Sequence, residues 1–378
     1  MKKLLTISAL ALLSACGEKP KSEEVAVVEE PKNILENMTY TVDTVLVDTG
    51  DDFINFAWPF ISSPSPNGNY FYVLDLKNEK LQKIDLDLMK LTDTFTIYKD
   101  GPNSPGSILG VTALHDDQFF FSQLHRLSVI NKEGEKTRSW ILDGDKIVEG
   151  FSADGGSVSN RIILDKDFSR LYSLPLNYET RDTYFAVLDS AGEKIMLEEL
   201  TEFQKANKFR IQGDSEGKGE FLHLQQFNDL VLISCSVGNG TYIYNPSLDS
   251  LFYREFPHEI VPLEKTGEVK NKVGGRAEFE EELKKLNHQI NYWSFLWDEK
   301  SQRYFRYASR AIGFDEEGWA KEFEIFFMAY SKDMELIGET RFGEFSTIPF
   351  GLFFKDGKLY SYVNVEDELG FAVFTFNF

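Results

Sequence analysis

Histidines and carboxylates are the residues of this sequence most able to do chemistry, and their spacing matches no familiar site. The five histidines are His115, His125, His223, His258 and His288. None of them forms the His-x-His or His-x-x-x-His pair that brings two metal ligands to one face of a strand or helix. The sequence also lacks a Gly-x-Ser-x-Gly elbow and a phosphate-binding glycine loop. We therefore predict no metal, no cofactor and no particular catalytic residue.

Acidic residues outnumber basic ones, 61 to 40, and give a formal net charge of −21. They are spread along the chain, as expected for a solvated acidic surface, although such a surface also attracts cations or basic partners. A polyanion is repelled by it, so we predict that nucleic acid is not a partner. A carboxylate pair for glycoside hydrolysis stays open, because the sequence does not choose a pair.

One motif does indicate a defined reaction, at the N-terminus. Lys2 and Lys3 precede an apolar run, Leu4 to Leu13, which is too short to span a bilayer as a helix. The run ends in Leu-Ser-Ala-Cys16, which resembles the lipobox of bacterial lipoproteins. The resemblance predicts a signal peptide at residues 1–15 and acylation of Cys16 by palmitate-type chains, each buried methylene contributing about 0.8 kcal/mol.

An acylated Cys16 implies a lipid anchor in the cell outer membrane, with the periplasmic and the surface face both open. Residues 16–37 are rich in Glu, Lys and Pro and poor in large apolar groups, so we expect a flexible tether. Cys235 is then the one remaining thiol. It lies in an apolar stretch, and we predict a small buried hydrophobe.

The rest of the chain, residues 38–378, repeats short strands and turns. Ser65-Pro66-Asn67-Gly68 is a turn that leads into the aromatic strand Tyr70 to Leu76, and similar units follow about every ten residues. They form five groups of four strands and a last group of three, with Phe53 to Ile61 as the first strand of the first group. Such spacing predicts an all-β protein, a six-bladed β-propeller.

The last group lacks an outer strand, and the isolated strand Met38 to Val47 can supply it. Pairing the two ends of the chain would close the ring and protect its edges. Seven blades and a pair of β-sandwiches are the alternative architectures.

Residues 257–290 interrupt the strand pattern. Phe279, Leu283, Leu286 and Ile290 form one apolar stripe, which predicts an amphipathic helix within Arg276 to Ile290. Glu280–Lys284 and Glu281–Lys285 are spaced as ion pairs on its other face. The helix either packs against a blade or covers the central opening as a lid.

Ligands of propellers usually meet one end of the central channel, where inner strands and loops converge. Residues expected at the ends of inner strands are the candidate ligand-binding residues, and Trp and Arg are the commonest anchors of binding faces. They are Trp58, His115, Arg161, Arg210, His223 and Trp293.

The Ser65-Pro66-Asn67-Gly68-Asn69-Tyr70-Phe71 stretch resembles the hairpin that opens TolB-like propeller repeats. With the lipobox, the early Asp43-Thr44-Val45 strand and the aromatic hairpins, the chain resembles the Bacteroidota lipoproteins grouped as domain of unknown function 4221. This resemblance implies a six-bladed propeller-like fold and an envelope location, and it carries no known catalytic residue.

Two functions are compatible with these features. The favoured one is a tethered propeller that binds a peptide, a glycan or a protein partner, which predicts a pocket lined by aromatic residues and arginine. The alternative is a propeller hydrolase or lyase acting on glycans or peptides, which predicts titratable groups that converge in the channel.

Overall fold

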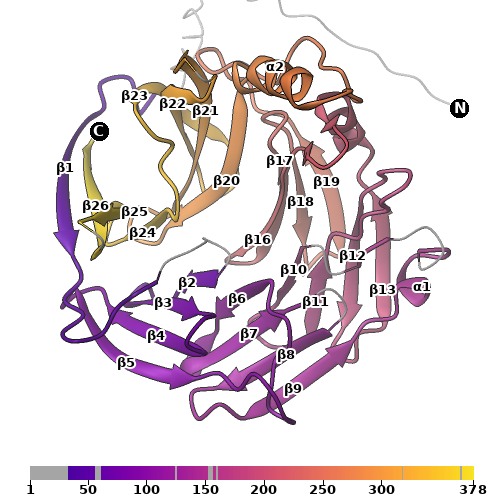
Figure 1. Ribbon diagram of the computed structural model, residues 1–378, viewed down its shortest axis with the longest axis vertical. Coiled ribbons are helices and arrows are strands. Elements are labelled where there is room, and N and C mark those ends of the chain that lie inside the picture. Colours follow the sequence, from indigo (N-terminus) through magenta and orange to yellow (C-terminus); the bar gives the residue numbers. More distant parts are fainter. Residues whose placement is uncertain are drawn as a thin grey trace, which may run out of the picture. The chain divides into compact units, whose positions relative to one another are not determined.

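The computed structural model describes residues 33–55, 61–123, 126–151, 156–158, 161–316, 318–366 and 368–378. Cys16 and Trp58 lie outside these residues. From Asn33 on, six four-stranded antiparallel sheets are arranged in a ring (Figure 1). This confirms the prediction of an all-β, six-bladed propeller.

Each of the first five blades contains four consecutive strands, the innermost first, whereas the sixth contains three consecutive strands and β1. The first three blades are formed by β2 (Ser62–Pro64), β3 (Tyr70–Asp75), β4 (Lys80–Asp85) and β5 (Lys90–Thr96); by β6 (Gly110–Ala113), β7 (Gln118–Ser122), β8 (Arg126–Asn131) and β9 (Lys136–Ile141); and by β10 (Ile162–Leu164), β11 (Arg170–Ser173), β12 (Tyr184–Asp189) and β13 (Lys194–Glu199).

The next two blades are formed by β16 (Leu222–Phe227), β17 (Leu230–Cys235), β18 (Thr241–Asn245) and β19 (Ser250–Arg254); and by β20 (Asn291–Asp298), β21 (Arg303–Phe314), β22 (Ala320–Tyr330) and β23 (Leu336–Phe345). The sixth has β24 (Phe353–Lys355), β25 (Lys358–Val365), β26 (Glu368–Asn377) and β1 (Thr39–Leu46). Short elements between strands are η2 (His115–Asp117), α1 (Gly144–Ile147), η3 (Thr201–Phe209) and the two-stranded sheet of β14 (Ile211–Gln212) and β15 (Gly217–Lys218).

The ring is closed as expected, by pairing of the two ends of the folded chain. β1 runs antiparallel to β26 from the Thr39–Asn377 pair to the Leu46–Gly370 pair. The sheet of the sixth blade therefore contains strands from both ends of the chain, and the edge of β26 is covered.

The folded unit begins before β1. The side chain of Asn33 exchanges hydrogen bonds with the main chain of Glu339 in β23, at 2.8 and 3.0 Å. Leu35 is fully buried, and Gly338 allows this close approach because a Cβ there would lie 2.9 Å from Ile34. Residues 33–37, assigned to the tether in the sequence analysis, thus pack against the fifth blade.

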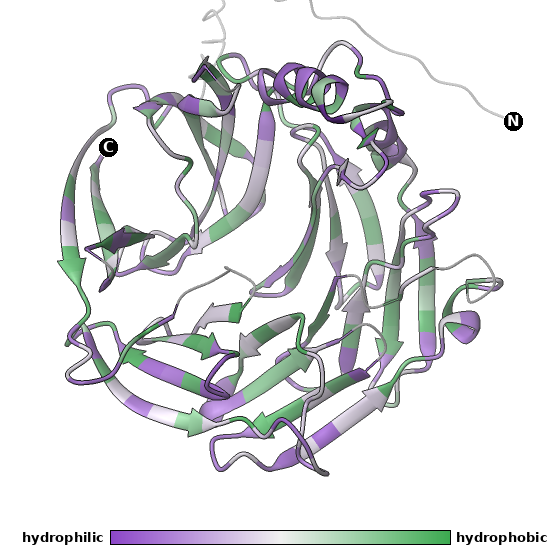
Figure 2. Ribbon diagram, viewed as in Figure 1, coloured by the Kyte–Doolittle hydropathy of each residue, from purple (hydrophilic) through white to green (hydrophobic). Residues whose placement is uncertain are grey.

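Alternation of side chains creates the core. Hydrophobic residues occupy much of the strands (Figure 2), and the second strands of the blades are buried at consecutive positions, as from Phe71 to Leu74 in β3. Because successive side chains point to opposite faces, each sheet presents apolar side chains to both neighbouring blades. The described residues contain six buried apolar clusters, one between each pair of adjacent blades. Cys235 is buried in one of them, and burial raises the pKa of its thiol to about 11.

The turn at Ser65–Tyr70 determines where the first inner strand lies. Ser65 N–H donates to Tyr70 O at 2.8 Å and Gly68 N–H donates to Ser65 O at 2.9 Å, with Gly68 at φ 71°. This closed turn pairs the residues just before Ser65 with β3, so the inner strand is Ser62–Pro64. The predicted strand Phe53 to Ile61 is wrong in the described part, because residues 53–55 form no strand.

The insertion contains the expected helix, α2 (Arg276–Asn287). Phe279, Leu283 and Leu286 pack on the cluster between the third and fourth blades. Figure 1 shows α2 at the periphery of the ring, so the helix packs on blades and does not cover the opening. Of the expected ion pairs, Lys285 does contact Glu281 at 3.0 Å, whereas Glu280 pairs with Arg276 at 2.7 Å.

Candidate functional site: a cavity at the centre of the ring

The inner strands all run in the same direction through the ring. We call the face where they end and turn into the second strands the turn side, and the opposite face the connection side. A cavity of about 1080 Å³ opens at the centre of the turn side. We call it the turn-side cavity. All six inner strands contribute to its wall, for example with Pro64, Thr112, Ile163, Gln226, Trp297 and Phe354.

Aromatic rings form one part of the wall. Phe227 and Trp297 are the aromatic residues near the ends of β16 and β20, and both rings pack on Tyr304, at centroid distances of 6.0 and 4.6 Å. Phe354 and Phe168 line other sides. Because Tyr304 is buried, it fixes the two rings that reach the cavity.

Polar side chains lie between the rings. Thr112, His115 and Gln226 line the cavity, and their side chains make no hydrogen bond to another residue in the part of the chain that the structure describes. His115 is exposed and belongs to a turn in which Asp116 and Asp117 have φ of 60° and 49°. These polar groups are available to a ligand.

The carboxylates of the wall are engaged in local structure. Asp298 accepts hydrogen bonds from the main-chain N–H of Lys300 and Ser301, at 3.2 and 3.1 Å. Glu299 accepts the indole N–H of Trp297 at 2.7 Å, and Asp356 pairs with the adjacent Lys355 at 3.0 Å. Each therefore fixes a turn or a neighbouring side chain.

Three of the residues predicted from the sequence lie one step deeper in the channel. They are Arg161, just before β10, His223 in β16 and Trp293 in β20. Each lies two positions before a residue of the cavity wall, which is Ile163, Gln225 or Phe295 respectively. Two residues of a strand span about 6.6 Å. We call these three residues the inner layer.

The inner layer is positively charged and poorly solvated. Burial, and after it the positive charges of Arg306 and Arg161, lower the pKa of His223 to about 3. Burial also lowers the pKa of Arg161. The Nε2 atom of His223 is buried and has no hydrogen-bond partner among the described residues. The charged form of His223 is thus disfavoured by burial and by two guanidinium groups.

Arg306, from β21, is fully buried beneath the inner layer. It donates to four main-chain carbonyl groups: those of Trp293 (2.7 Å), Asn239 (2.8 Å), Cys235 (3.2 Å) and Gly238 (3.5 Å). Its guanidinium also lies 4.7 and 4.9 Å from the ring centroids of Tyr292 and Phe295. No carboxylate of the described residues lies within ion-pair distance of it.

The other predicted residues have different places. Trp293 is partly buried, with its ring stacked on Tyr307 at 5.6 Å and its indole N–H bonded to Ser309. Arg210 does not line the cavity: it donates to Gln212 at 2.7 Å, next to the two-stranded sheet on the connection side. His115 lines the cavity, and Trp58 lies outside the described residues.

The aromatic and amide residues of the wall, such as Phe227, Trp297 and Gln226, are not among the residues predicted from the sequence. A signal for them was present, because an aromatic residue occurs near the last position of several predicted inner strands.

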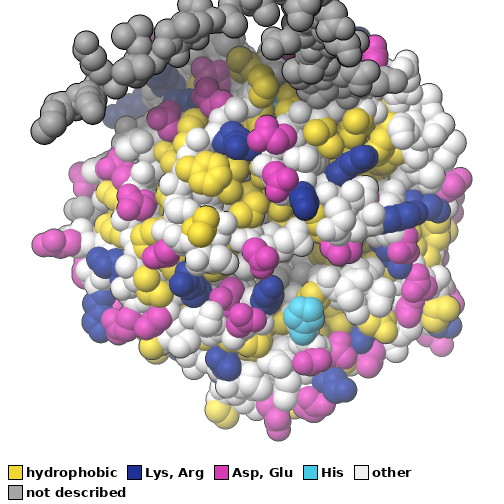
Figure 3. Space-filling model, turned by 180° about the vertical axis from the view of Figure 1, so that it is seen from behind, with side chains coloured by type: hydrophobic (Ala, Val, Ile, Leu, Met, Phe, Trp, Pro, Cys, Tyr) yellow, Lys and Arg dark blue, Asp and Glu magenta, His cyan; other side chains and the backbone are white. Residues whose placement is uncertain are grey.

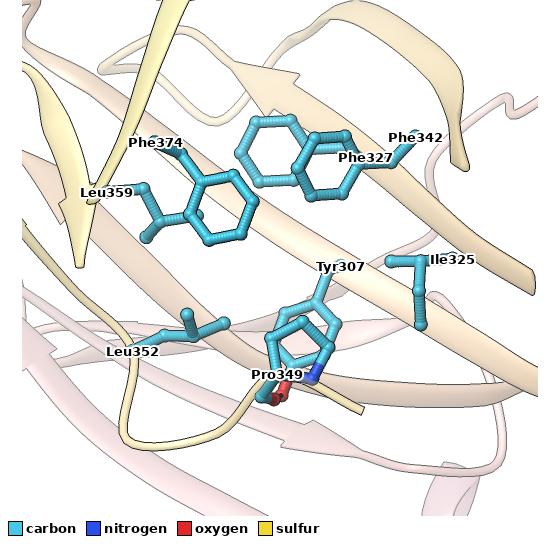
Figure 4. Close-up of a pocket in the computed structure, with 8 residues that line it drawn as sticks. All are labelled: Tyr307, Ile325, Phe327, Phe342, Pro349, Leu352, Leu359 and Phe374. Carbon is cyan, nitrogen blue, oxygen red and sulfur yellow. Dashed lines mark hydrogen bonds between the residues drawn. The ribbon is translucent and has the colours of Figure 1, made fainter. Parts of the chain in front are cut away.

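A second, smaller pocket lies between the fifth and sixth blades (Figure 4). Its volume is about 10 Å³, and it is lined by Tyr307, Phe327, Phe342, Leu359 and other apolar residues. The Tyr307 hydroxyl donates to Pro349 O at 2.9 Å. A void of this size holds at most one water, so it is a packing gap and no ligand site.

The face shown in Figure 3 carries acidic, basic and apolar side chains interspersed, with no large area of one kind. On this face, charged side chains of both signs are therefore dispersed. Among the described residues, no group of three or more His, Cys, Asp or Glu is placed to hold a metal ion. No helix in that part of the chain has the length and apolar character needed to cross a bilayer.

These features define a class of protein: a six-bladed propeller with a solvent-accessible central cavity. The pattern of one family, described as a domain of unknown function (DUF4221), matches residues 32–341. The chain belongs to this family.

Solved structures agree on the fold. The chain is similar to a DUF4221 family member from Bacteroides vulgatus, at 15% identity and a TM-score of 0.65, with 92% of this chain and 99% of that chain covered. It is also similar to a putative exported protein from Bacteroides fragilis, at 11% identity and a TM-score of 0.51, covering 89% and 95% of the two chains. Among curated proteins, none matches this chain.

Proposed function

We propose that this protein is a lipoprotein of the cell outer membrane whose propeller binds a short glycan in the turn-side cavity. A peptide or a protein partner is the other ligand class that the sequence leaves open. The observation that carries the proposal is the composition of the cavity wall, which combines aromatic residues of β16, β20 and β24 with polar side chains such as Thr112 and Gln226.

A sugar ring presents apolar C–H faces and a rim of hydroxyl groups. Aromatic side chains such as Trp297 and Phe227 match the faces, and amide or hydroxyl groups such as Gln226 and Thr112 match the rim. A volume of about 1080 Å³ is at the upper end of the range for ligand pockets, which suits several sugar units. A flat protein partner would instead use the rim of the ring.

The hydrolase alternative makes a different demand on the same cavity. Glycoside hydrolysis needs two carboxyl groups about 5 to 9.5 Å apart on either side of the bond that breaks. The engagement of Asp298 and Glu299 in turn and indole hydrogen bonds favours binding over hydrolysis. If the protein released reducing ends from members of a glycan panel, this preference for binding over hydrolysis would be overturned.

Trp297→Ala is expected to weaken glycan binding by about 10- to 100-fold, because a large ring in a supported position is removed. The measurement is calorimetric titration with the best ligand of a glycan panel. The matched control is Trp319→Ala, which removes an exposed indole at the β21–β22 hairpin, outside the cavity wall. Equal affinities of the Trp297 and Trp319 variants would contradict the proposed site.

Cys16→Ser is expected to move the protein from the membrane fraction to the soluble fraction, because acyl chains on Cys16 provide the anchor. Cell fractionation with labelled palmitate checks this result, and Cys235→Ser is the control, since that thiol is buried. Incorporation of labelled palmitate into the Cys16→Ser protein would contradict the proposed anchor.

A further inference from the structure

The turn-side cavity is surrounded by turns. In every blade a short turn joins the inner strand to the second strand, and all six of these turns lie in the described part of the chain. Each turn contributes at least one residue to the lining of the cavity. The turns are residues 65–69, 114–117, 165–169, 228–229, 299–302 and 356–357. A ligand therefore enters along the axis of the ring, between these turns.

Hydrogen bonds within the turns hold this rim in place. In the second blade, Leu114 N–H donates to Gln118 O at 2.7 Å. In the third, the Asp165 carboxylate accepts from the main-chain N–H and from the hydroxyl of Ser169, each at 2.8 Å. Turns closed by such bonds keep a defined conformation. The longest of the six has five residues, so the rim contains no long loop that could swing aside.

Below the rim, hydrogen bonds connect neighbouring inner strands directly. The Ser63 hydroxyl of β2 accepts the main-chain N–H of Ala113 in β6 at 3.0 Å. The Gln225 side chain of β16 donates to the main-chain oxygen of Phe295 in β20 and accepts from the N–H of the same residue, both at 2.8 Å. The first and second blades, and likewise the fourth and fifth, are thus joined at the cavity, and no cleft between them leads out of it.

The cavity does not extend to the starts of β16 and β20. Its wall contains residues 225–227 and 295–298, which are the last residues of these strands. Near the strand starts, Lys265 Nζ donates to Glu220 at 2.7 and 2.8 Å and to Asn291 at 3.4 Å. The side chains of Lys265 and Glu220 are each only 3% exposed. Buried side chains therefore close the base of the cavity in this part of the ring.

We infer that the turn-side cavity binds the end of a glycan chain and not a segment from its middle. The inference rests on the proposed function for its ligand class. An internal segment leaves its site at two points, which requires a groove open at both ends or a passage through the ring. The end of a chain needs one opening, and six turns around a central cavity provide one. The volume of about 1080 Å³ then holds the terminal units, while the rest of the chain extends into solvent.

The first experiment counts protein molecules per glycan chain. Calorimetric titration uses linear amylose, xylan, mannan and polygalacturonate, each as a short and a several-fold longer fraction. For a polysaccharide that binds, the same stoichiometry per chain is expected for both fractions, since every chain has one end of the recognised kind. If the number of bound protein molecules rises with chain length, the preference for chain ends is overturned and glycan binding stands. If no polysaccharide binds, both proposals are overturned.

A second experiment blocks one end of the chain at a time. The short fraction of the polysaccharide that binds carries a bulky group on its reducing end in one sample and on its non-reducing end in another. One of the two groups is expected to abolish binding, because a blocked end cannot pass between the turns. The other group is expected to leave the affinity unchanged. If both samples bind as tightly as the unmodified chain, the cavity does not recognise chain ends.

A substitution inside the cavity tests how deeply the chain enters. Thr112 is exposed, lines the cavity and lies on β6, two positions before the turn 114–117. Thr112→Trp places a large ring in the path of the chain end and is expected to weaken binding by about tenfold or more. Thr41→Trp is the control, because it makes the same change on the exposed outer strand β1. Equal affinities of the two variants, both folded by circular dichroism, would place the glycan across the mouth and overturn the inference.

Discussion

Arg306→Met is expected to lower the free energy of unfolding by about 3–5 kcal/mol, one of the two largest effects of single substitutions that we expect in this protein. The guanidinium joins the fifth blade to the fourth, because β21 carries it and the carbonyl groups of Cys235, Gly238 and Asn239 accept from it. Methionine fills a similar volume, so the expected loss reflects buried carbonyl groups left without donors. Urea denaturation measures it.

The control for this prediction is Arg254→Met. Arg254 also donates to main-chain carbonyl groups, of Asp333 and Met334, but its side chain is one-third exposed, so water replaces the lost donor. A loss below about 1 kcal/mol is expected there. Similar losses in the two variants would show that burial of Arg306 does not matter. Arg306→Lys should recover little of the lost free energy of unfolding, because an ammonium group has three donors and lacks the planar fork of a guanidinium.

Glu339→Gln is expected to cost about 2–4 kcal/mol at pH 7. The nearly buried carboxylate of Glu339 accepts from the main-chain N–H groups of Glu259 (2.5 Å), Ile260 (3.0 Å) and Val261 (3.2 Å), which ties the start of the insertion to β23. The carboxylate also lies 3.1 Å from Nδ1 of His258. The other ring nitrogen of His258, Nε2, lies 3.2 Å from the Tyr330 hydroxyl. A glutamine amide replaces one acceptor oxygen with a donor that faces other donors.

The effect of Glu339 should depend on pH. Burial alone raises its pKa, but the hydrogen bonds from His258 and from the N–H groups of Glu259 and Ile260 outweigh burial and hold the pKa below its ordinary value of 4.5. A carboxyl whose pKa is lowered by folding stabilises the protein above the unfolded-state pKa and loses this contribution as the pH falls through the folded-state value. The stability difference between wild type and Glu339→Gln should therefore shrink below pH 4.5.

The matched control is Glu344→Gln on the same strand, β23. Glu344 is exposed and pairs with Arg341 at the surface, so a change near zero is expected. Urea denaturation of the three proteins between pH 3 and pH 7 checks both results. A difference between wild type and Glu339→Gln that stays constant below pH 4.5 would exclude the ionised carboxylate as its source.

The sequence by itself determined the strands, their grouping into blades and the closure of the ring. These features follow from local patterns: turn residues such as Asn67-Gly68, alternation along each strand, and one isolated strand near the N-terminus that matches the strand missing from the last group. The apolar stripe of α2 was equally local. Of its two expected ion pairs, Glu281–Lys285 is present, whereas Lys284 lies 5.0 Å from the ring of Phe314 and Glu280 pairs with Arg276 instead.

Only the tertiary structure decided which residues share the cavity. Its wall takes Thr112, Gln226 and Trp297 from inner strands separated by long stretches of sequence, and no local period relates such positions. The ring geometry likewise placed the charge of Arg161 where it lowers the pKa of His223, and placed Arg210 next to the two-stranded sheet. Local pattern fixes the strands because a strand pairs with its nearest neighbour in sequence, whereas a central site needs six strands that meet only when the ring closes.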